Sequence, residues 1–252
     1  MEQRELFIES TFDHSLQPSL FYGSESAEKR PLLVGLHTWS FDRFNQIKNM
    51  LPHAEANDFN LLLPEFRGKN TAGNPNCKKA CGSEFAKQDI KDAIDYVIEH
   101  ENVDADHIFL LGSSGGGHMA LLMAGMIPEY FEAVAAFVPI TDLNRWYDET
   151  DNYKKSILAC CGGEDREEML RRSPVSYIDV ASKGNIKLFH GKWDPVVPFT
   201  QSVRYFDEMH KRYPGASVYL DIFDGKHQMD MKQAMYWFLS QYKKQKITEV
   251  TG

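Results

Sequence analysis

The stretch HIFLLGSSGGGHMALLMAG, residues 107–125, joins an apolar segment of strand length to a helical pattern through a glycine-rich turn. The turn carries the pattern Gly-x-Ser-x-Gly at residues 112–116, with Ser114 at its centre. A sharp turn from strand to helix strains the central residue and leaves no room for side chains two positions away, so glycine is needed on both sides. We therefore expect the Ser114 hydroxyl to be exposed at the end of a buried strand. Ser113 lacks this setting because residue 111 is leucine.

Two other interpretations of this turn compete with a serine nucleophile. Ser114 would be the N-cap of an ordinary helix, or the glycines would hold a phosphate at the N-terminus of a helix. The sequence GSSGGG at residues 112–117 has neither the glycine spacing of a dinucleotide-binding loop nor the lysine of a nucleoside-triphosphate loop. The position between a strand and a helix favours the nucleophile.

The rest of the chain alternates between apolar segments of strand length and helical patterns. The expected strands are ELFIES, PSLFYG, PLLVGLH, NLLLPEF, HIFLLG, AVAAFV, IKLFHG and SVYLDIFD, and the expected helices cover 43–57, 84–100, 116–127, 200–212 and 230–243. Strands that are apolar almost throughout are buried on both faces by crossover helices. The pattern predicts an α/β protein with an eight-stranded, mostly parallel sheet, helices on both faces and an antiparallel edge formed by the first two strands.

Residues 141–180 interrupt this alternation after the sixth expected strand. They are rich in charged and aromatic side chains, among them Trp146, Tyr147 and Tyr153. An insertion at this point would shape the substrate pocket, and we interpret it as a small lid. Because the chain has no linker of low complexity, we expect residues 1–252 to form one domain.

Composition excludes several classes of function. The net charge is -8, whereas proteins that bind nucleic acid or anionic membranes need a basic surface. The N-terminus lacks the apolar core of a signal peptide and no run of 18 apolar residues occurs, so we expect a cytoplasmic protein, unless an upstream signal has been removed. The four cysteines match no zinc site, and free thiols are expected, with a Cys77–Cys81 disulfide as the alternative.

A serine nucleophile requires a histidine as general base and a carboxylate that orients it. His227 follows the last expected strand and Asp194 follows the strand before it, and reactive groups gather at the carboxyl ends of parallel strands. We therefore expect the catalytic order Ser114, Asp194, His227. Asp142 and Asp224 are the rival acids.

The negative charge that develops during attack on an ester carbonyl is stabilised by backbone N–H groups. One donor is expected from Gly115, which follows the nucleophile, and the other from the loop after PLLVGL. We favour the N–H of Trp39, with Thr38 as the alternative.

These motifs resemble the α/β-hydrolase superfamily, and more narrowly the catalytic domain of the prolyl oligopeptidase-like (S9) serine hydrolases. The resemblance covers about residues 31–243 and includes GSSGGG, FRGKN, RRSPVSY, HGKWDPVVPFTQS and GKHQM. It implies an eight-stranded sheet and a triad of Ser114, His227 and Asp194. The chain departs from the family in lacking room for the β-propeller of S9 peptidases and in having Thr38 where related esterases often have glycine.

Small proteins of this kind resemble esterases that act on acetyl, feruloyl or other short acyl groups. We expect a carboxylic ester hydrolase that needs no metal or cofactor, with a small-molecule or carbohydrate ester as substrate and a homodimer as one option. The alternatives are an aminopeptidase or acyl-peptidase, with pocket charge from Arg145, Glu149 or Arg67, and a non-catalytic binding protein of the same fold. Side chains that are candidates for substrate contact are Arg67, Arg145, Trp146 and Trp193. For Arg67 the favoured role is to tie neighbouring loops together, and for Trp193 it is to shield Asp194.

Overall fold

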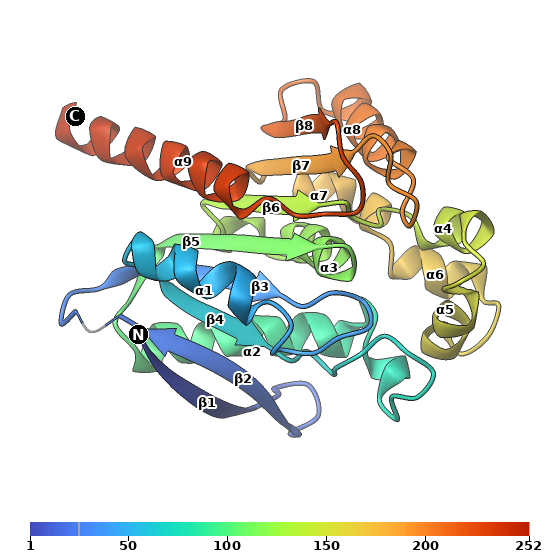
Figure 1. Ribbon diagram of the computed structural model, residues 1–252, viewed down its shortest axis with the longest axis horizontal. Coiled ribbons are helices and arrows are strands. Elements are labelled where there is room, and N and C mark those ends of the chain that lie inside the picture. Colours follow the sequence, from blue (N-terminus) through green and yellow to red (C-terminus); the bar gives the residue numbers. More distant parts are fainter. Residues whose placement is uncertain (25, 252) are drawn as a thin grey trace.

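The computed structural model describes the backbone of residues 1–24 and 26–251 and the side chains of residues 1–24 and 26–242. Eight strands form one sheet in the order β1-β2-β4-β3-β5-β6-β7-β8 (Figure 1). Their bounds are β1 Glu2–Glu9, β2 Leu16–Gly23, β3 Arg30–Leu36, β4 Asn60–Pro64, β5 Val103–Ser113, β6 Ala133–Phe137, β7 Ile186–Gly191 and β8 Val218–Phe223. The strands from β4 to β8 are parallel to one another, while β1 and β2 form the antiparallel edge. The expected α/β-hydrolase architecture is confirmed.

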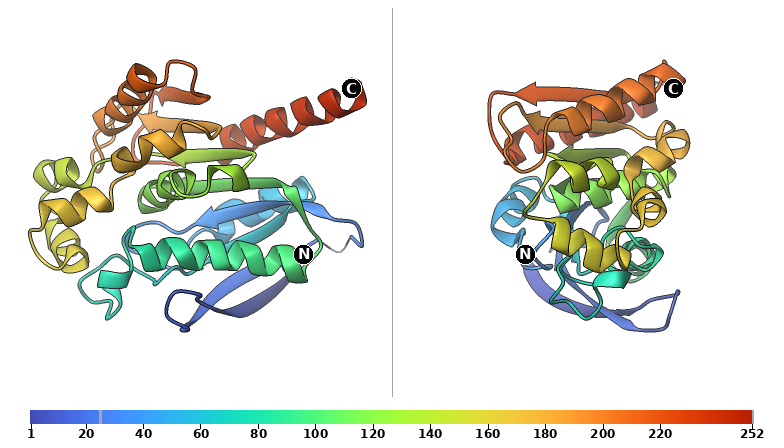
Figure 2. Two further views of the ribbon diagram at one scale, coloured as in Figure 1. Left: turned by 180° about the vertical axis from the view of Figure 1, so that it is seen from behind. Right: turned by 90° about the vertical axis from the view of Figure 1, so that its right-hand side faces the viewer.

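Helices cover both faces of this sheet (Figure 2). The longer ones are α1 Ile47–Ala56, α2 Glu84–His100, α3 Gly115–Ala124, α8 Thr200–Arg212 and α9 Met231–Thr251. Helices α2, α3 and α8 pack on one face, and α1 and α9 on the other. Successive strand residues therefore enter different cores: in β5, Ile108 and Leu110 contact the first group, whereas Phe109 and Leu111 contact the second. This two-sided burial explains why the central strands are apolar almost throughout.

The chain between β6 and β7 folds into short helices beyond the carboxyl ends of the strands (Figure 1). These are α4 Leu143–Glu149, α5 Lys154–Cys161 and α6 Arg166–Arg171, whereas α7 Ile178–Ala181, which follows them, packs in the core on the same face of the sheet as α3. Among the described residues, the 3-10 turns are η1 Cys77–Lys79, η2 Pro128–Tyr130 and η3 Pro174–Tyr177. Helices α4, α5 and α6 form a third apolar cluster with Trp39, which lies in the loop after β3. The segment thus packs directly against a loop expected to take part in catalysis.

Some expected boundaries differ from those observed. Helices α2 and α8 have the expected bounds, but α1 begins at Ile47 because residues 43–46 form turns. Helix α3 ends at Ala124, before the expected residue 127, and α9 runs to Thr251. Among the described helices, none is both long and apolar enough to span a bilayer.

Candidate active site

Ser114 lies at the turn between β5 and α3 in a strained conformation, with φ 57° and ψ -120°. Its N–H donates to the Phe137 carbonyl at 2.9 Å, which fixes the turn against β6. A Cβ at Gly112 would lie 2.0 Å from the Gly116 carbonyl oxygen, and one at Gly116 would lie 2.4 Å from the Leu36 carbonyl oxygen. Both glycines are therefore required sterically, and the strain falls on the serine between them.

Ser114 and His227 line the same cavity, which has a volume of about 330 Å³. Its lining is contributed by Thr38, Trp39, Ser40, Phe41, Asn45, Gln46, Asn49, Ser113, Ser114, Tyr153, His227, Gln228 and Met229. Within the part of the chain that the structure describes, no hydrogen bond joins the Ser114 hydroxyl to His227. Such bonds are often long in unliganded hydrolases and shorten when substrate binds.

The imidazole of His227 is held by Asp194. His227 Nδ1 lies 2.7 Å from Asp194 Oδ2, and the other carboxylate oxygen accepts from the N–H groups of Val196 and Val197 at 2.8 and 3.0 Å. Since Nδ1 donates to the carboxylate, His227 Nε2 is left as the proton acceptor. The two loops meet closely, because a Cβ at Gly191 would lie 2.2 Å from the Lys226 carbonyl oxygen.

The Asp194 carboxylate is completely buried yet stays ionised. Burial by itself would raise the pKa of Asp194, but contacts with His190 and His227 and the N–H of Val197 outweigh burial and lower the pKa well below its ordinary value. His190 is also buried; its Nε2 lies 3.4 Å from Asp194 Oδ2 and 2.9 Å from the Val197 carbonyl. A carboxylate held in this way stabilises a positive charge on the neighbouring imidazole.

The rival acids and the neighbouring histidine have other partners. Asp224 accepts from the indole N–H of Trp193, and Asp142 caps α4 by accepting from the N–H of Arg145. His118 lies in α3, and burial lowers its pKa to about 4, while its Nε2 contacts the Arg172 carbonyl at 2.7 Å. None of these three side chains lines the cavity of Ser114.

The loop after β3 brings two backbone N–H groups close together. A Cβ at Gly115 would lie 2.5 Å from Trp39 N, so the backbone of Gly115 is in direct contact with that of Trp39. Among the described residues, neither the N–H of Gly115 nor that of Trp39 has a hydrogen-bond partner. The N–H of Thr38, in contrast, donates to Asn45 Oδ1 at 3.3 Å. The geometry therefore favours Trp39 over Thr38 as the second oxyanion donor.

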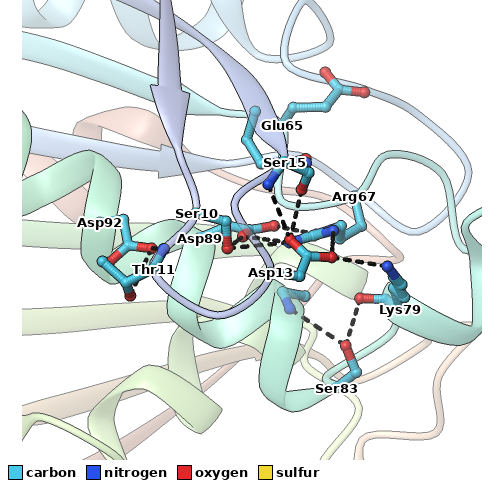
Figure 3. A network of polar contacts seen from close by, with 12 residues as sticks. Ser10, Thr11, Asp13, Ser15, Glu65, Arg67, Lys79, Ser83, Asp89 and Asp92 are labelled. Atoms are coloured by element: carbon cyan, nitrogen blue, oxygen red, sulfur yellow. Dashed lines mark hydrogen bonds and ion pairs between the residues drawn. The ribbon is translucent and has the colours of Figure 1, made fainter.

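None of the four candidates for substrate contact lines this cavity, although Trp146 packs against Trp39 and Tyr153, which do line it. Arg67 is buried in a network with Asp89 at 2.5 Å and Asp13 at 2.9 Å (Figure 3), so its role is structural. Arg145 lies on α4 with its Nε 3.4 Å from Asp142. Trp193 is 60% exposed and bonded to Asp224, so it does not shield Asp194, and Trp146 is fully buried with its N–H on the Val196 carbonyl.

No pattern in the sequence indicated the amide side chains of the cavity. Asn45 and Gln46 lie in the turn before α1, and Asn49 lies in its first turn, in a stretch that we expected to be an ordinary helix. Helical periodicity in a sequence does not indicate the conformation of the turn before the helix, and so does not indicate where the side chains of that turn point. Tyr153 reaches the same cavity from between α4 and α5.

The described residues hold neither a candidate metal site nor a disulfide. Over residues 1–24 and 26–242, no group of three or more His, Cys, Asp or Glu side chains is arranged to hold a metal ion. The four cysteines are free thiols, and no Cys77–Cys81 disulfide is formed.

Comparison with known proteins gives a family. The sequence profile of the prolyl oligopeptidase family matches residues 45–244. The acylamino-acid-releasing enzyme 2 of Oryza sativa subsp. japonica is 26% identical over 229 residues, which are 83% of this chain and 29% of that protein. An acetylxylan esterase of Coprinopsis cinerea is 27% identical over 127 residues, 46% of this chain and 33% of that protein. The chain thus spans less than a third of the length of the Oryza protein.

A solved structure shows the same fold. The acylaminoacyl peptidase of Pyrococcus horikoshii superposes with a TM-score of 0.72 at 22% identity, over 90% of this chain and 37% of that chain. Because the family profile covers most of the chain, the chain belongs to the prolyl oligopeptidase family of serine hydrolases.

Proposed function

We propose that this protein hydrolyses carboxylic esters with uncharged acyl groups, with Ser114 as nucleophile, His227 as general base and Asp194 as the group that orients His227. One observation carries the proposal. The strained Ser114 and the Asp194-bound His227 line a single cavity, although 113 positions separate them in the sequence (227 - 114 = 113).

In this mechanism Ser114 Oγ attacks the ester carbonyl and its proton passes to His227 Nε2. The carbonyl oxygen becomes negative and is stabilised by the N–H groups of Gly115 and Trp39, while Asp194 stabilises the imidazolium. The carbon–oxygen bond of the ester then breaks, and the leaving alcohol takes the proton from His227. A water molecule repeats these steps on the acyl-enzyme and releases the carboxylic acid.

The lining of the cavity supports an uncharged substrate. Among the described residues that line it, none is Asp, Glu, Lys or Arg; the polar ones besides His227 are amides and hydroxyls. A substrate ammonium or carboxylate would enter without a counter-charge, at a cost of several kcal/mol if it were desolvated. This argues against an aminopeptidase that recognises a free N-terminus.

A second candidate is an acyl-peptidase, because several relatives are named acylamino-acid-releasing enzymes. A blocked amino terminus is neutral, so it suits the same cavity. The acetylxylan esterase relative supports the ester substrate instead. Residues 141–180 act in both cases as a cap on the site, to which Tyr153 contributes a wall.

The substrate classes are separated by a panel of chromogenic compounds together with acetylated xylan. We expect p-nitrophenyl acetate or acetylated xylan to be cleaved with the highest kcat/KM, N-acetylalanyl p-nitroanilide more slowly, and alanyl p-nitroanilide with its free amine at least about 100-fold more slowly than the N-acetyl compound. A higher kcat/KM for the free amine than for both acetylated classes would contradict the proposal. Ser114→Ala is the control that assigns each activity to this site.

A further inference from the structure

The second oxyanion donor lies in a loop whose orientation is fixed by side chains outside the triad, and the following inference rests on the proposed function. In the peptide group that joins Thr38 to Trp39, the carbonyl oxygen lies 3.0 Å from His37 Nδ1 and 3.3 Å from the N–H of Phe41. In a trans peptide the N–H points opposite to the carbonyl. The Trp39 N–H therefore points away from these partners, and the backbone of Trp39 is in contact with that of Gly115.

The next peptide group is also anchored. The Trp39 carbonyl accepts from the N–H of Asn70 at 2.8 Å. Asn70 is itself buried, and its Oδ1 accepts from the N–H of Cys81 at 2.8 Å. The chain on the C-terminal side of the Trp39 N–H is thus held by a hydrogen bond from a buried residue.

On the N-terminal side, the loop is held by Asn45. Its Oδ1 accepts from the N–H of Thr38 at 3.3 Å, from the Thr38 hydroxyl at 3.0 Å and from Gln46 Nε2 at 3.0 Å. Gln46 is 4% exposed, and its Oε1 accepts from Asn49 Nδ2 at 2.9 Å. Since three donors converge on one amide oxygen, the Asn45 side chain has a single favourable orientation.

We propose that Asn45 is a positioning residue for the oxyanion site. By accepting the N–H of Thr38, it removes the competing donor from the cavity and leaves the N–H of Trp39 as the partner of Gly115. Donors stabilise a developing oxyanion most when they are in place before the reaction, because no reorganisation is then needed. Without the Asn45 oxygen the loop is no longer held in one orientation, so the N–H of Trp39 is not fixed toward the substrate.

The test compares three variants of the whole chain. Asn45→Ala removes the acceptor, Asn45→Asp keeps it, and Asn57→Ala is the matched control. Asn57 lies at the other end of α1, also makes a hydrogen bond to the backbone, at 2.8 Å to the His53 carbonyl, and does not line the cavity. The readouts are kcat and KM with p-nitrophenyl acetate, and amide hydrogen exchange at Thr38 by NMR, which needs no activity.

We expect Asn45→Ala to lower kcat about 10- to 100-fold with KM within about threefold of the native value, since the donors act on the transition state. Exchange at the Thr38 amide should become at least about tenfold faster. Asn57→Ala should keep the native kcat and Thr38 exchange. Asn45→Asp should keep the slow exchange at Thr38, because its carboxylate oxygen still accepts from Thr38, while its negative charge in the cavity keeps kcat below the native value.

Native kcat in Asn45→Ala, or an exchange at Thr38 as fast in Asn45→Asp as in Asn45→Ala, would overturn the role of Asn45. So would an equal loss in Asn57→Ala, which would indicate general damage to α1. If the native protein has no turnover that depends on Ser114, the proposed function itself is wrong, even where exchange at Thr38 changes as expected.

Discussion

At the scale of single residues, the Asp194 carboxylate decides which nitrogen of His227 accepts a proton. In Asp194→Asn, the amide oxygen still accepts from Val196 and Val197, which turns the amide NH₂ toward His227 Nδ1. His227 then carries its proton on Nε2 and no longer accepts from Ser114. We expect kcat for p-nitrophenyl acetate to fall about 10⁴-fold in Asp194→Asn, against about 10⁶-fold in Ser114→Ala. A loss of less than tenfold in Asp194→Asn would remove Asp194 from the triad.

Gly115 permits the close approach of the two proposed oxyanion donors. In Gly115→Ala the new methyl group would lie 2.5 Å from Trp39 N and 2.6 Å from Trp39 Cα, and backbone atoms yield only at a high cost. The Trp39 loop must move, so we expect kcat to fall about 10²- to 10³-fold, as for the loss of one oxyanion donor. Gly73→Ala is the control, because a Cβ there meets no atom within 4 Å. Equal kcat in the two variants would speak against an oxyanion site at Gly115.

Some residues of the site could be predicted from the sequence, because a steric rule or the order of the strands determines their position. The Gly-x-Ser-x-Gly turn marked Ser114, and the order of strands placed Asp194 and His227 at the same end of the sheet. Asn45 was missed, because its contact with Thr38 depends on turns that no periodic pattern reports. The prediction that Trp193 shields Asp194 was wrong. Trp193 is next to Asp194 in the sequence, but its side chain does not face the carboxylate and instead donates a hydrogen bond to Asp224, which follows β8.

At the scale of elements, helix α2 illustrates a well-predicted boundary. Ser83 precedes its first residue, and the Ser83 hydroxyl accepts from the N–H of Ala86 at 3.2 Å, as an N-cap does. Helix α1 has no such signal, since Gln46 at its N-cap position makes no side-chain capping bond, and its start was predicted four residues too early. Strand β5 was predicted too short, because residues 104–106 at its beginning are partly or fully exposed and include two aspartates.

Arg172 joins the segment of helices α4–α6 to the loop that contains Lys78 and Ala80. This arginine is nearly buried and donates to the carbonyls of Lys78 and Ala80 at 2.9 Å, and to Glu168 at 2.6 Å. Removing it leaves the carbonyls of Lys78 and Ala80 without their donor, and each buried acceptor left unsatisfied costs about 1 to 3 kcal/mol.

We therefore expect Arg172→Met to lower the free energy of unfolding in urea by about 3 kcal/mol. The control is Arg171→Met, because the neighbouring Arg171 is exposed and pairs with the same Glu168 at 2.9 Å, and surface pairs contribute less than about 1 kcal/mol. Equal destabilisation by the two substitutions would show that Arg172 does not anchor this segment.

At the scale of the whole molecule, buried histidines make stability depend on pH. Burial lowers the pKa of His118 from an ordinary value of 6.5 to about 4. Between these two values the unfolded chain binds a proton that the folded protein does not, so stability must rise with pH across this window and fall as the pH is lowered. The full difference corresponds to about 3 kcal/mol. Asp194 adds a loss at still lower pH, because its pKa is also lowered on folding.

This dependence is measured by urea unfolding at several values between pH 4 and pH 7. In His118→Gln, whose amide can still donate to the Arg172 carbonyl, we expect the slope of unfolding free energy against pH to decrease by up to one proton. Burial lowers the pKa of His37 as well, so in this variant the free energy of unfolding still depends in part on pH. The same slope in native protein and variant would mean that His118 is not kept neutral by the fold.

The central claim is that Ser114 is a nucleophile activated by His227, and it is tested most directly by reaction with a fluorophosphonate followed by mass spectrometry of the labelled peptide. We expect one equivalent of label on Ser114 in the native protein, no label in Ser114→Ala, and reaction slowed at least about 10³-fold in His227→Ala. Label on Ser113 or on any other residue, or an unchanged rate in His227→Ala, would contradict it.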